Sequence, residues 1–334
     1  MKRRMVAAAA MAAAVFIGSG AQAAPAVTVV DVEKVPRGAD LAVAWVDGAD
    51  RSIHAGAATI PTGFDLPVAS FRTVSGGFLV ERNDHRLFHI STAGAKTDLG
   101  AVDRYVVRTG RYAGSQFVTE RQTANGYRLE VRRASDLSLV RGRTFPSYFR
   151  EMDFHDGVVW VKSGKWLFNT NEFVRVDKLV RGRAEAIEAR VNAFAGRADG
   201  GVLVVSPLRG TAWAPWRARA GSHVRAWSPD GRFVVLNYPH DDDGFDDLLE
   251  VRNARTGAHV ARFYGTFNGA VTWEDATHFL VPASDIGVTD LGLAPVPPET
   301  VVRLGVNGSA RRASSLVGPD HHDGPYVTLV SERS

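Results

Sequence analysis

A short turn followed directly by a β-prone strand is the feature that most constrains the fold of this chain. Its clearest copy is the run Trp227-Ser-Pro-Asp-Gly-Arg232, which continues into Phe233-Val-Val-Leu236. Proline and glycine stand at turn-favoured positions, and the strand that follows is apolar and β-branched. Weaker copies of this unit recur along most of the sequence. The recurrence predicts a fold built from repeated strands.

The spacing of these units indicates the architecture. One residue early in each repeated strand serves as an anchor, and successive anchors are 37, 39, 42, 44, 30 and 46 residues apart; they are Leu41, Phe78, Phe117, Val159, Leu203, Phe233 and Phe279. A period of about 40 residues is typical of the four-stranded blades of a propeller. A β-sandwich gives turn signals without such a period. We therefore predict an all-β fold, a β-propeller of seven four-stranded blades, with six or eight blades as alternatives.

Each unit also shows an internal order of strands. After the anchor strand come a turn and a second apolar strand, as at 86–90, 127–131 and 248–251, and then a third turn and an edge strand. We label the anchor strand B, the next two C and D, and the strand before the anchor A. Long helical periodicity is nearly absent, and the best helix candidate, 181–190, carries little apolar face.

The two ends of the chain are expected to meet. The strand-like run Tyr326–Val330 follows the last unit with too few residues for another blade. It is predicted to pair with the N-terminal strands near Val27–Val32. Closing the ring with N- and C-terminal strands removes the exposed sheet edges that an open array would leave.

The N-terminus has the pattern of a secretory signal peptide. Lys2, Arg3 and Arg4 precede an apolar run from Met5 to Gly18, and Ala21-Gln-Ala23 forms a small-residue cleavage site before Ala24. A membrane anchor, the alternative, needs around 20 apolar residues, and this run is shorter. We predict a signal peptide at 1–23, a single propeller domain at 24–334, and a secreted or periplasmic location without a membrane span.

Charge and cysteine content exclude several classes of function. The chain has 40 basic and 36 acidic residues, and removal of the signal peptide leaves a net charge of +1. The arginines are scattered among acids rather than clustered, so no nucleic-acid partner is expected. The chain has no cysteine, which excludes disulfides, thiolate metal sites and cysteine nucleophiles. Its Ala-, Arg-, Gly- and Val-rich composition is typical of a GC-rich bacterial genome, and we expect a monomer.

Two units resemble a known family. The run Trp227-Ser-Pro-Asp-Gly-Arg-Phe233, followed by Glu250-Val-Arg-Asn-Ala-Arg-Thr-Gly257, is similar to a blade of the WD40-like and TolB-like β-propellers, and Trp273-Glu-Asp275 begins the next unit in the same way. The resemblance implies a ring of four-stranded sheets around a channel, most often a binding platform. The chain departs from these families in having no Gly-His…Trp-Asp pair and no additional domain before the propeller.

The densest group of ionisable residues lies between the predicted strands B and C of the sixth unit, in the run His240–Asp247. Calcium binds six to eight oxygen ligands, and the candidate ligands are Asp241, Asp243, Asp246 and Asp247. Aligned with a 12-residue calcium loop, however, the first ligand position is Pro239, which cannot coordinate an ion. A solvated turn is therefore the favoured interpretation, and a calcium site is the alternative.

A second candidate group is aromatic. Trp213 and Trp216, close to Arg217 and Arg219, together with His240, are the candidate ligand-binding residues for a sugar or an acidic molecule. The alternative is that the tryptophans fill the space between blades.

The histidine-rich run Asp320-His-His-Asp323 offers zinc-type ligands. Adjacent histidines of an extended chain point to opposite sides, which favours a polar turn instead. The isolated His85, His89, His155 and His278 are assigned structural hydrogen-bonding roles.

No catalytic residue is assigned, because a Gly-x-Ser-x-Gly nucleophile turn is absent from the sequence. We predict an exported propeller that acts as a binding or scaffold module for a protein or a small-molecule or glycan ligand. The alternative is an extracellular hydrolase or lyase that acts on a carbohydrate or related polymer. No cofactor is expected apart from the calcium alternative.

Overall fold

The fold comes from a computed structural model of the 334-residue chain. The residues that it describes are 25–48, 50–107, 114–146, 151–155, 158–163, 166–169, 174–175, 183–208, 212–239, 247–284, 299–315 and 327–330. Within these ranges the helical segments are two single 3-10 turns, Ala189–Val191 and Asp199–Gly201, and all other regular elements are β-strands. The predicted all-β fold class is confirmed.

Five sheets contain four antiparallel strands each, and strands that follow one another in the chain pair side by side. The first sheet comprises β29 (Val327–Leu329), β2 (Trp45–Asp47), β3 (Ser52–Ala55) and β4 (Ala58–Pro61). The second comprises β5 (Val68–Val74), β6 (Gly77–Arg82), β7 (Arg86–Ser91) and β8 (Lys96–Ala101). The third comprises β9 (Arg104–Val107), β10 (Gln116–Thr123), β11 (Gly126–Arg133) and β12 (Leu139–Phe145). The fourth comprises β13 (Glu151–His155), β14 (Val158–Ser163), β15 (Trp166–Asn169) and β16 (Val174–Arg175). The fifth comprises β17 (Arg183–Glu188), β18 (Ala193–Arg197), β19 (Val202–Pro207) and β20 (Trp216–Ala220).

The remaining strands form one nine-stranded sheet with two four-stranded groups. One group comprises β21 (His223–Trp227), β22 (Phe233–Pro239), β23 (Asp247–Asn253) and β24 (His259–Phe267). The other comprises β25 (Thr272–Trp273), β26 (His278–Ser284), β27 (Glu299–Gly305) and β28 (Ala310–Arg312). The groups are joined where the end of β24 pairs with the end of β26. The ninth strand, β1 (Val27–Val29), lies parallel to β24.

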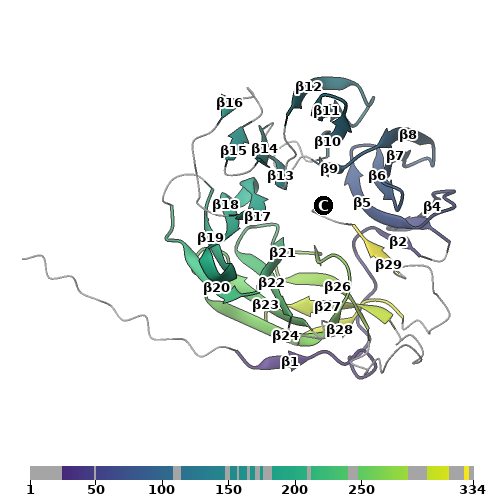
Figure 1. The fold of residues 1–334 in the computed structure, drawn as a ribbon. Coiled ribbons are helices and arrows are strands. Elements are labelled where there is room, and N and C mark those ends of the chain that lie inside the picture. The colour runs from purple at the N-terminus through teal and green to yellow at the C-terminus, as the bar shows by residue number, and fades with distance from the viewer. Residues whose placement is uncertain are drawn as a thin grey trace, which may run out of the picture.

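The sheets surround a common centre, and the first strand of each sheet lies closest to it (Figure 1). Neighbouring innermost strands contact one another, as β29 does β5, β9 does β13, and β17 does β21. Such a ring of radially arranged four-stranded sheets is a β-propeller. The predicted propeller fold is therefore confirmed.

Apolar layers between neighbouring sheets form the core. Side chains alternate along a strand, so positions 261, 263, 265 and 267 of β24 are buried, whereas positions 262, 264 and 266 are more exposed. Between the first two sheets, Val46 and Ile53 pack with Phe71 and Phe78. The repeat therefore buries each sheet against the next, which explains why the sequence shows one apolar strand after another.

The turn at Trp227–Phe233 is held by its own side chains. The Ser228 hydroxyl accepts a hydrogen bond from the Phe233 N–H at 2.9 Å and donates one to Asp230 Oδ1 at 2.7 Å. Gly231 has φ of 70°, and a Cβ at this position would lie 2.1 Å from Cγ1 of Val191 in the preceding sheet. Trp227 is 1% exposed. These residues are therefore architectural.

Two of the sequence anchors, Leu41 and Leu203, do not lie on the second strand of a sheet. Leu203 lies on β19, the third strand of its sheet, whereas the second strand is β18. With Phe194 of β18 as the anchor, the irregular steps of 44 and 30 residues become 35 and 39. Leu41 precedes β2, which begins at Trp45. Likewise, the helix candidate at 181–190 forms β17 and the 3-10 turn at Ala189–Val191.

The C-terminal strand pairs with a different N-terminal strand from the one predicted. β29 is antiparallel to β2, with Trp45 opposite Leu329, whereas Val27–Val29 pairs with β24. The segment 30–42 runs between these two strands, and its side chains Val30, Val32 and Val35 are buried in the core of the nine-stranded sheet. We call residues 27–42 the N-terminal strap.

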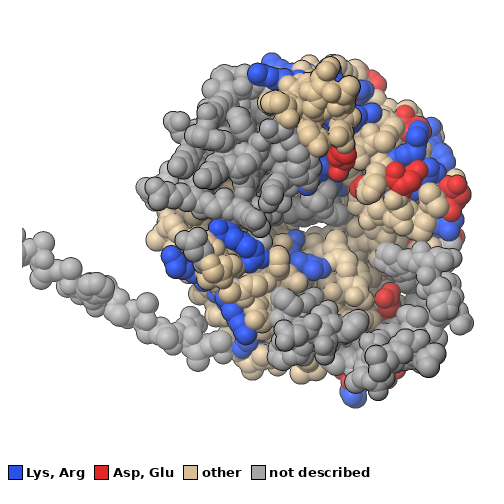
Figure 2. All heavy atoms as spheres, viewed as in Figure 1, with Lys and Arg blue, Asp and Glu red and all other residues tan. Residues whose placement is uncertain are grey.

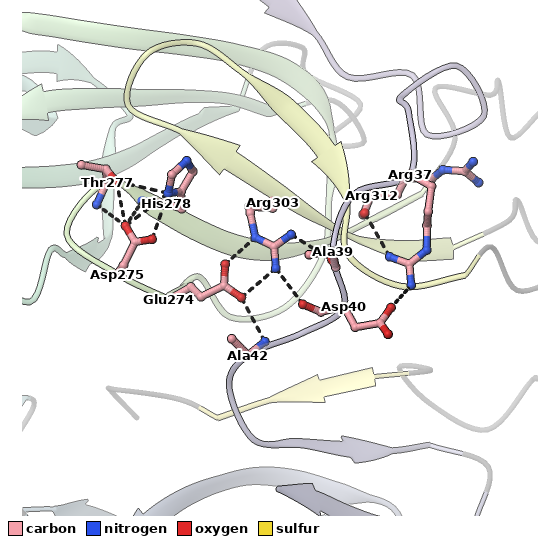
Figure 3. Close-up of polar contacts among 10 residues, drawn as sticks. All are labelled: Arg37, Ala39, Asp40, Ala42, Glu274, Asp275, Thr277, His278, Arg303 and Arg312. Atoms are coloured by element: carbon pink, nitrogen blue, oxygen red, sulfur yellow. Dashed lines mark hydrogen bonds and ion pairs between the residues drawn. The ribbon is translucent and has the colours of Figure 1, made fainter. Parts of the chain in front are cut away.

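Polar contacts fix the second half of the strap to β27 and β28 (Figure 3). Arg303 donates hydrogen bonds to the carbonyl oxygens of Ala39 and Asp40, each at 2.9 Å, and forms an ion pair with Glu274. The Glu274 carboxylate in turn accepts the N–H of Ala42 at 3.0 Å. Because Arg303 and Glu274 engage backbone groups of Ala39, Asp40 and Ala42, these groups do not pair with another strand. The apolar run at Leu41 is therefore not a blade strand.

Candidate functional site

The connections between strands leave the ring at two ends. In each sheet the B-to-C turn lies at the same end as the link from strand D to the next sheet, because the strands are antiparallel. We call this end the B–C face and the opposite end, which carries the A-to-B and C-to-D turns, the A–B face. Figure 2 shows charged side chains of both signs over β6–β8 and an opening near the centre of the ring.

Three metal-ligating side chains converge on the B–C face at the hairpin of β2 and β3. One oxygen each of Asp47 and Asp50 and one ring nitrogen of His54 all lie within 4.8 Å of one another. Asp50 is exposed, and the other two are half-buried. Solvent therefore reaches the group at Asp50, and we call the three residues the Asp-Asp-His group.

The hairpin itself brings these residues together. Val46 and Ile53 pair across it and point into the core, so Asp47 and His54 share the opposite side of the two strands. Trp45 lies directly opposite His54, and their rings stack with centroids 4.1 Å apart and planes 12° apart. This stacking fixes the plane of the imidazole, which is the usual task of residues behind a metal ligand.

Hydrogen bonds further orient the group. Asp50 Oδ1 accepts the N–H of Ser52 at 2.8 Å, which holds the turn. The Thr59 hydroxyl lies 3.3 Å from His54 Nδ1, and among the described residues no hydrogen-bond partner reaches the buried His54 Nε2. Of the two ring nitrogens, Nε2 is thus the one that no described hydrogen bond engages.

Two carboxylates and an imidazole suit zinc or a similar transition metal better than calcium, which prefers oxygen ligands alone. Zinc bonds of about 2.0–2.2 Å require ligand atoms about 3.3–3.5 Å apart, so the side chains would have to move together by about 1 Å. Three protein ligands leave a coordination position open for a water molecule or a ligand group.

The structure describes the predicted calcium loop only at its ends. β22 ends at Pro239 and β23 begins with Asp247, both at the B–C face, whereas His240 and Asp241, Asp243 and Asp246 lie outside the described residues. The run Asp320–Asp323 also lies outside them. The calcium alternative therefore stays a prediction.

The two predicted ligand-binding tryptophans lie at the other end of the ring. Trp213 precedes β20 and Trp216 begins it, in a C-to-D connection of the A–B face. Trp216 is 8% exposed, and its indole N–H donates a hydrogen bond to the Ala254 carbonyl at 2.9 Å. Trp213 is partly buried against the same apolar cluster. This geometry corresponds to the packing alternative, and it places the tryptophans at the opposite end of the ring from Pro239 and Asp247.

Several other charged groups hold the sheets together. The third strands β11 and β23 each carry a Glu-x-Arg pair, Glu130 with Arg132 at 2.7 Å and Glu250 with Arg252 at 2.6 Å. Both carboxylates belong to residues that are 8% exposed. The Arg252 guanidinium also lies over the ring of Trp216, at 5.8 Å. We therefore assign these pairs to packing between sheets.

His278 lies in a turn of the A–B face (Figure 3). Its Nδ1 is 2.9 Å from Asp275 Oδ2, and Asp275 also accepts hydrogen bonds from the N–H and hydroxyl of Thr277. Partial burial raises the pKa of Asp275, but the hydrogen bonds from Thr277 and His278 outweigh it and lower the pKa to about 2. The structural role predicted for His278 agrees with these contacts.

The Asp-Asp-His group is not among the candidate residues that the sequence predicts. A weak signal was present, because Asp47-Gly48 and Asp50 form a turn followed by a Ser-Ile-His alternation. Taking the hairpin as strands B and C would have placed Asp47 and His54 on one side of the sheet.

Comparison with known proteins supports the fold. No family model matches the chain, and no curated protein matches it. A chain of the mitotic checkpoint complex is similar with a TM-score of 0.52 and 12% identity, over 83% of this chain and 85% of that one. An uncharacterized protein from Listeria monocytogenes EGD-e is similar with a TM-score of 0.50 and 11% identity, over 75% of this chain and 84% of that one. Hsv2p from Kluyveromyces lactis has a TM-score of 0.47 and 11% identity, over 72% of this chain and 75% of that one.

The first two similarities show the fold alone, because their identities of 12% and 11% are far below the level at which function transfers. Within the described part of the chain, no helix is long and apolar enough to cross a membrane.

Proposed function

We propose that this protein is an exported β-propeller that binds a protein, a small molecule or a glycan on its B–C face. The observation that carries the proposal is the convergence of Asp47, Asp50 and His54 on that face. Side chains that bind an ion and leave a coordination position open form a natural attachment point for a ligand oxygen. The proposal includes the location, outside the cytoplasm after cleavage near Ala24, and the relationship to WD40-like and TolB-like propellers.

We also propose that the ring has seven blades and is closed by strands from both chain ends. The two groups of the nine-stranded sheet, counted separately, add two blades to the five separate sheets. The pairing of β29 with β2 supports closure. The calcium site at Asp241, Asp243, Asp246 and Asp247 remains a separate proposal for the same face.

Metal titration of the mature chain from Ala24 tests the site. We expect calorimetry to show one Zn²⁺ or Mn²⁺ bound, and Asp47→Asn with Asp50→Asn to weaken the affinity at least tenfold. Asp65→Asn is the matched control, because Asp65 is an exposed acid of the same face that pairs with Arg82. Equal affinity in the double variant and the wild type would refute the site.

A second titration separates the two cation proposals. Ca²⁺ binding that Asp243→Ala abolishes and the Asp47/Asp50 double variant preserves would belong to the His240–Asp247 loop. A thermal-shift screen with glycans, in the presence of metal or of a chelator, then tests ligand binding. A glycan that stabilises the metal-loaded protein but not the double variant is the expected result.

The alternative function is a cation-assisted hydrolase or lyase that acts on a carbohydrate or related polymer. The convergence of three potential ligands at the Asp-Asp-His group is the observation that favours it, because a metal held by three protein ligands could activate a water molecule. Release of reducing sugar by the metal-loaded protein, lost in the Asp47/Asp50 double variant, would support the enzyme over the binding module.

A further inference from the structure

A group of basic side chains lies on the B–C face at the turn between β20 and β21. It consists of Arg197 at the end of β18, Arg219 on β20 and His223 at the start of β21. Figure 2 shows Lys and Arg side chains gathered over β19–β21 on this face. The three residues come from two neighbouring sheets, so the group lies at the boundary between them.

Backbone carbonyls hold the Arg197 guanidinium in place. Its Nη1 donates a hydrogen bond to the Gly201 carbonyl at 2.6 Å, and its Nη2 donates one to the Ser222 carbonyl at 3.0 Å. Nη2 also lies 3.1 Å from Nδ1 and 3.2 Å from Nε2 of His223, so the guanidinium rests against the imidazole ring. The cation is therefore oriented before any ligand arrives.

An aromatic ring orients Arg219. The guanidinium carbon of Arg219 lies 3.8 Å from the centroid of the Tyr238 ring on β22. The turn keeps room for that ring, because Gly221 has φ of 84° and a Cβ there would lie 3.2 Å from Tyr238 Cε2. Stacking holds a guanidinium flat and leaves its edge N–H groups available for hydrogen bonds.

In the part of the chain that the structure describes, no acid neutralises the two arginines of β20, Arg217 and Arg219. Among the described residues, no carboxylate forms an ion pair with Arg217 or Arg219, and both side chains are on exposed positions of β20. Arg82 and Arg303, by contrast, each pair with a carboxylate. Within the described residues Arg219 therefore has no competing carboxylate, and its stacked guanidinium offers hydrogen-bond donors to an external anion.

We infer that Arg197, Arg219 and His223 form a binding site for the anionic group of a ligand, a carboxylate, sulfate or phosphate. Planar guanidinium groups bind such oxyanions through two parallel N–H···O bonds. The inference deepens the proposed function and rests on it, because this site lies on the same B–C face and would define the ligand as acidic.

Titration with small anions at constant ionic strength tests the site. We expect inorganic phosphate, sulfate and acetate to shift side-chain NMR signals of Arg197, Arg219 and His223, and their relative affinities to distinguish the anion classes. Arg197→Gln with Arg219→Gln should weaken binding of the preferred anion at least tenfold. Arg255→Gln, an exposed arginine on a turn of the A–B face, is the matched control and should change the affinity less than twofold.

The single variant Arg219→Gln protects the test against a folding defect. Arg219 is exposed and rests on one ring, so this variant should fold and should weaken anion binding about threefold. Unchanged affinity in Arg219→Gln, or an equal loss in Arg255→Gln, would overturn the inference. The Asp47/Asp50 double variant should bind the anion as the wild type does, so failure here and failure of the cation site are distinguishable.

Discussion

The N-terminal strap should contribute measurably to stability through a single buried valine. Val32 is fully buried, and it packs with Val30 and Val35 in the core of the nine-stranded sheet. Val32→Ala removes two methyl-sized groups. At about 0.8 kcal/mol for each, the loss of burial costs about 1.6 kcal/mol, and the cavity left behind raises the cost to about 3 kcal/mol.

The assay is thermal and urea unfolding of the chain from Ala24. With an unfolding entropy of about 0.65 kcal/mol/K for a chain of this size, the loss corresponds to a decrease in Tm of about 2–5 °C. Val29→Ala is the matched control, because Val29 belongs to the same strap but is 59% exposed. It should change the free energy of unfolding by no more than about 0.5 kcal/mol. Equal effects of the two variants would refute the buried position of the strap.

Three further predictions concern the turns and the core. Gly231→Ala should lower the free energy of unfolding by about 2–5 kcal/mol, because it adds a clash with Val191 to the strain of a positive φ. Gly200→Ala, with a similar φ but open space around it, should lower it by about 1–2 kcal/mol. Equal losses of the two variants in urea unfolding would argue against the clash. Asp275 has a folded-state pKa of about 2 against an ordinary 3.8, so its stabilisation is present above pH 3.8 and is lost as pH falls toward 2; acid unfolding of Asp275→Asn should lack this component. Trp216→Phe should lower stability by about 1–3 kcal/mol, because the buried carbonyl that accepts its N–H loses a partner; a neutral change would contradict the role in packing.

The sequence predicted the fold class well because the periodic signal has a direct physical origin. Each sheet must bury an apolar second strand against its neighbours, so anchors such as Phe78, Phe117 and Phe279 fall on β6, β10 and β26. In the fifth sheet the second strand is Ala193–Arg197, whose alanines and glycine give a weaker strand signal than Val202–Val205. The prediction therefore moved to the third strand.

The N-terminal errors have a different cause. The apolar run around Leu41 has the composition of a strand, yet its backbone is bound by Glu274 and Arg303, which are more than 200 residues away. No local pattern reports such contacts. The pairing partner of β29 was missed for the same reason, since the runs Val27–Val32 and Leu41–Trp45 both have the composition of a strand and tertiary contacts decide the pairing.

The candidate sites were harder to predict than the fold because each joins residues from separate strands. Asp47 and His54 meet across a hairpin, and Arg219 meets Tyr238 across two sheets. The dense acidic run at His240–Asp247 was predicted as a candidate site because its residues are adjacent in sequence. Adjacency in sequence is a poor guide on a propeller, where strands of different sheets approach one another at the rim.

The positions of the two proposed groups constrain the ligand. The Asp-Asp-His group belongs to the sheet of β29 and β2–β4, whereas the basic group lies between the sheets of β17–β20 and β21–β24, across the ring (Figure 1). A small molecule held at one group would not touch the other. The changes in its binding free energy caused by the two sets of variants would then be additive. A ligand that contacts both must span the opening of the ring, and its binding would show coupling between the cation and the guanidinium variants. A double-mutant cycle that combines the Asp47/Asp50 variant with the Arg197/Arg219 variant and measures ligand affinity therefore decides between the two cases. Independent effects indicate a small acidic ligand, and coupled effects indicate an extended acidic polymer or protein surface.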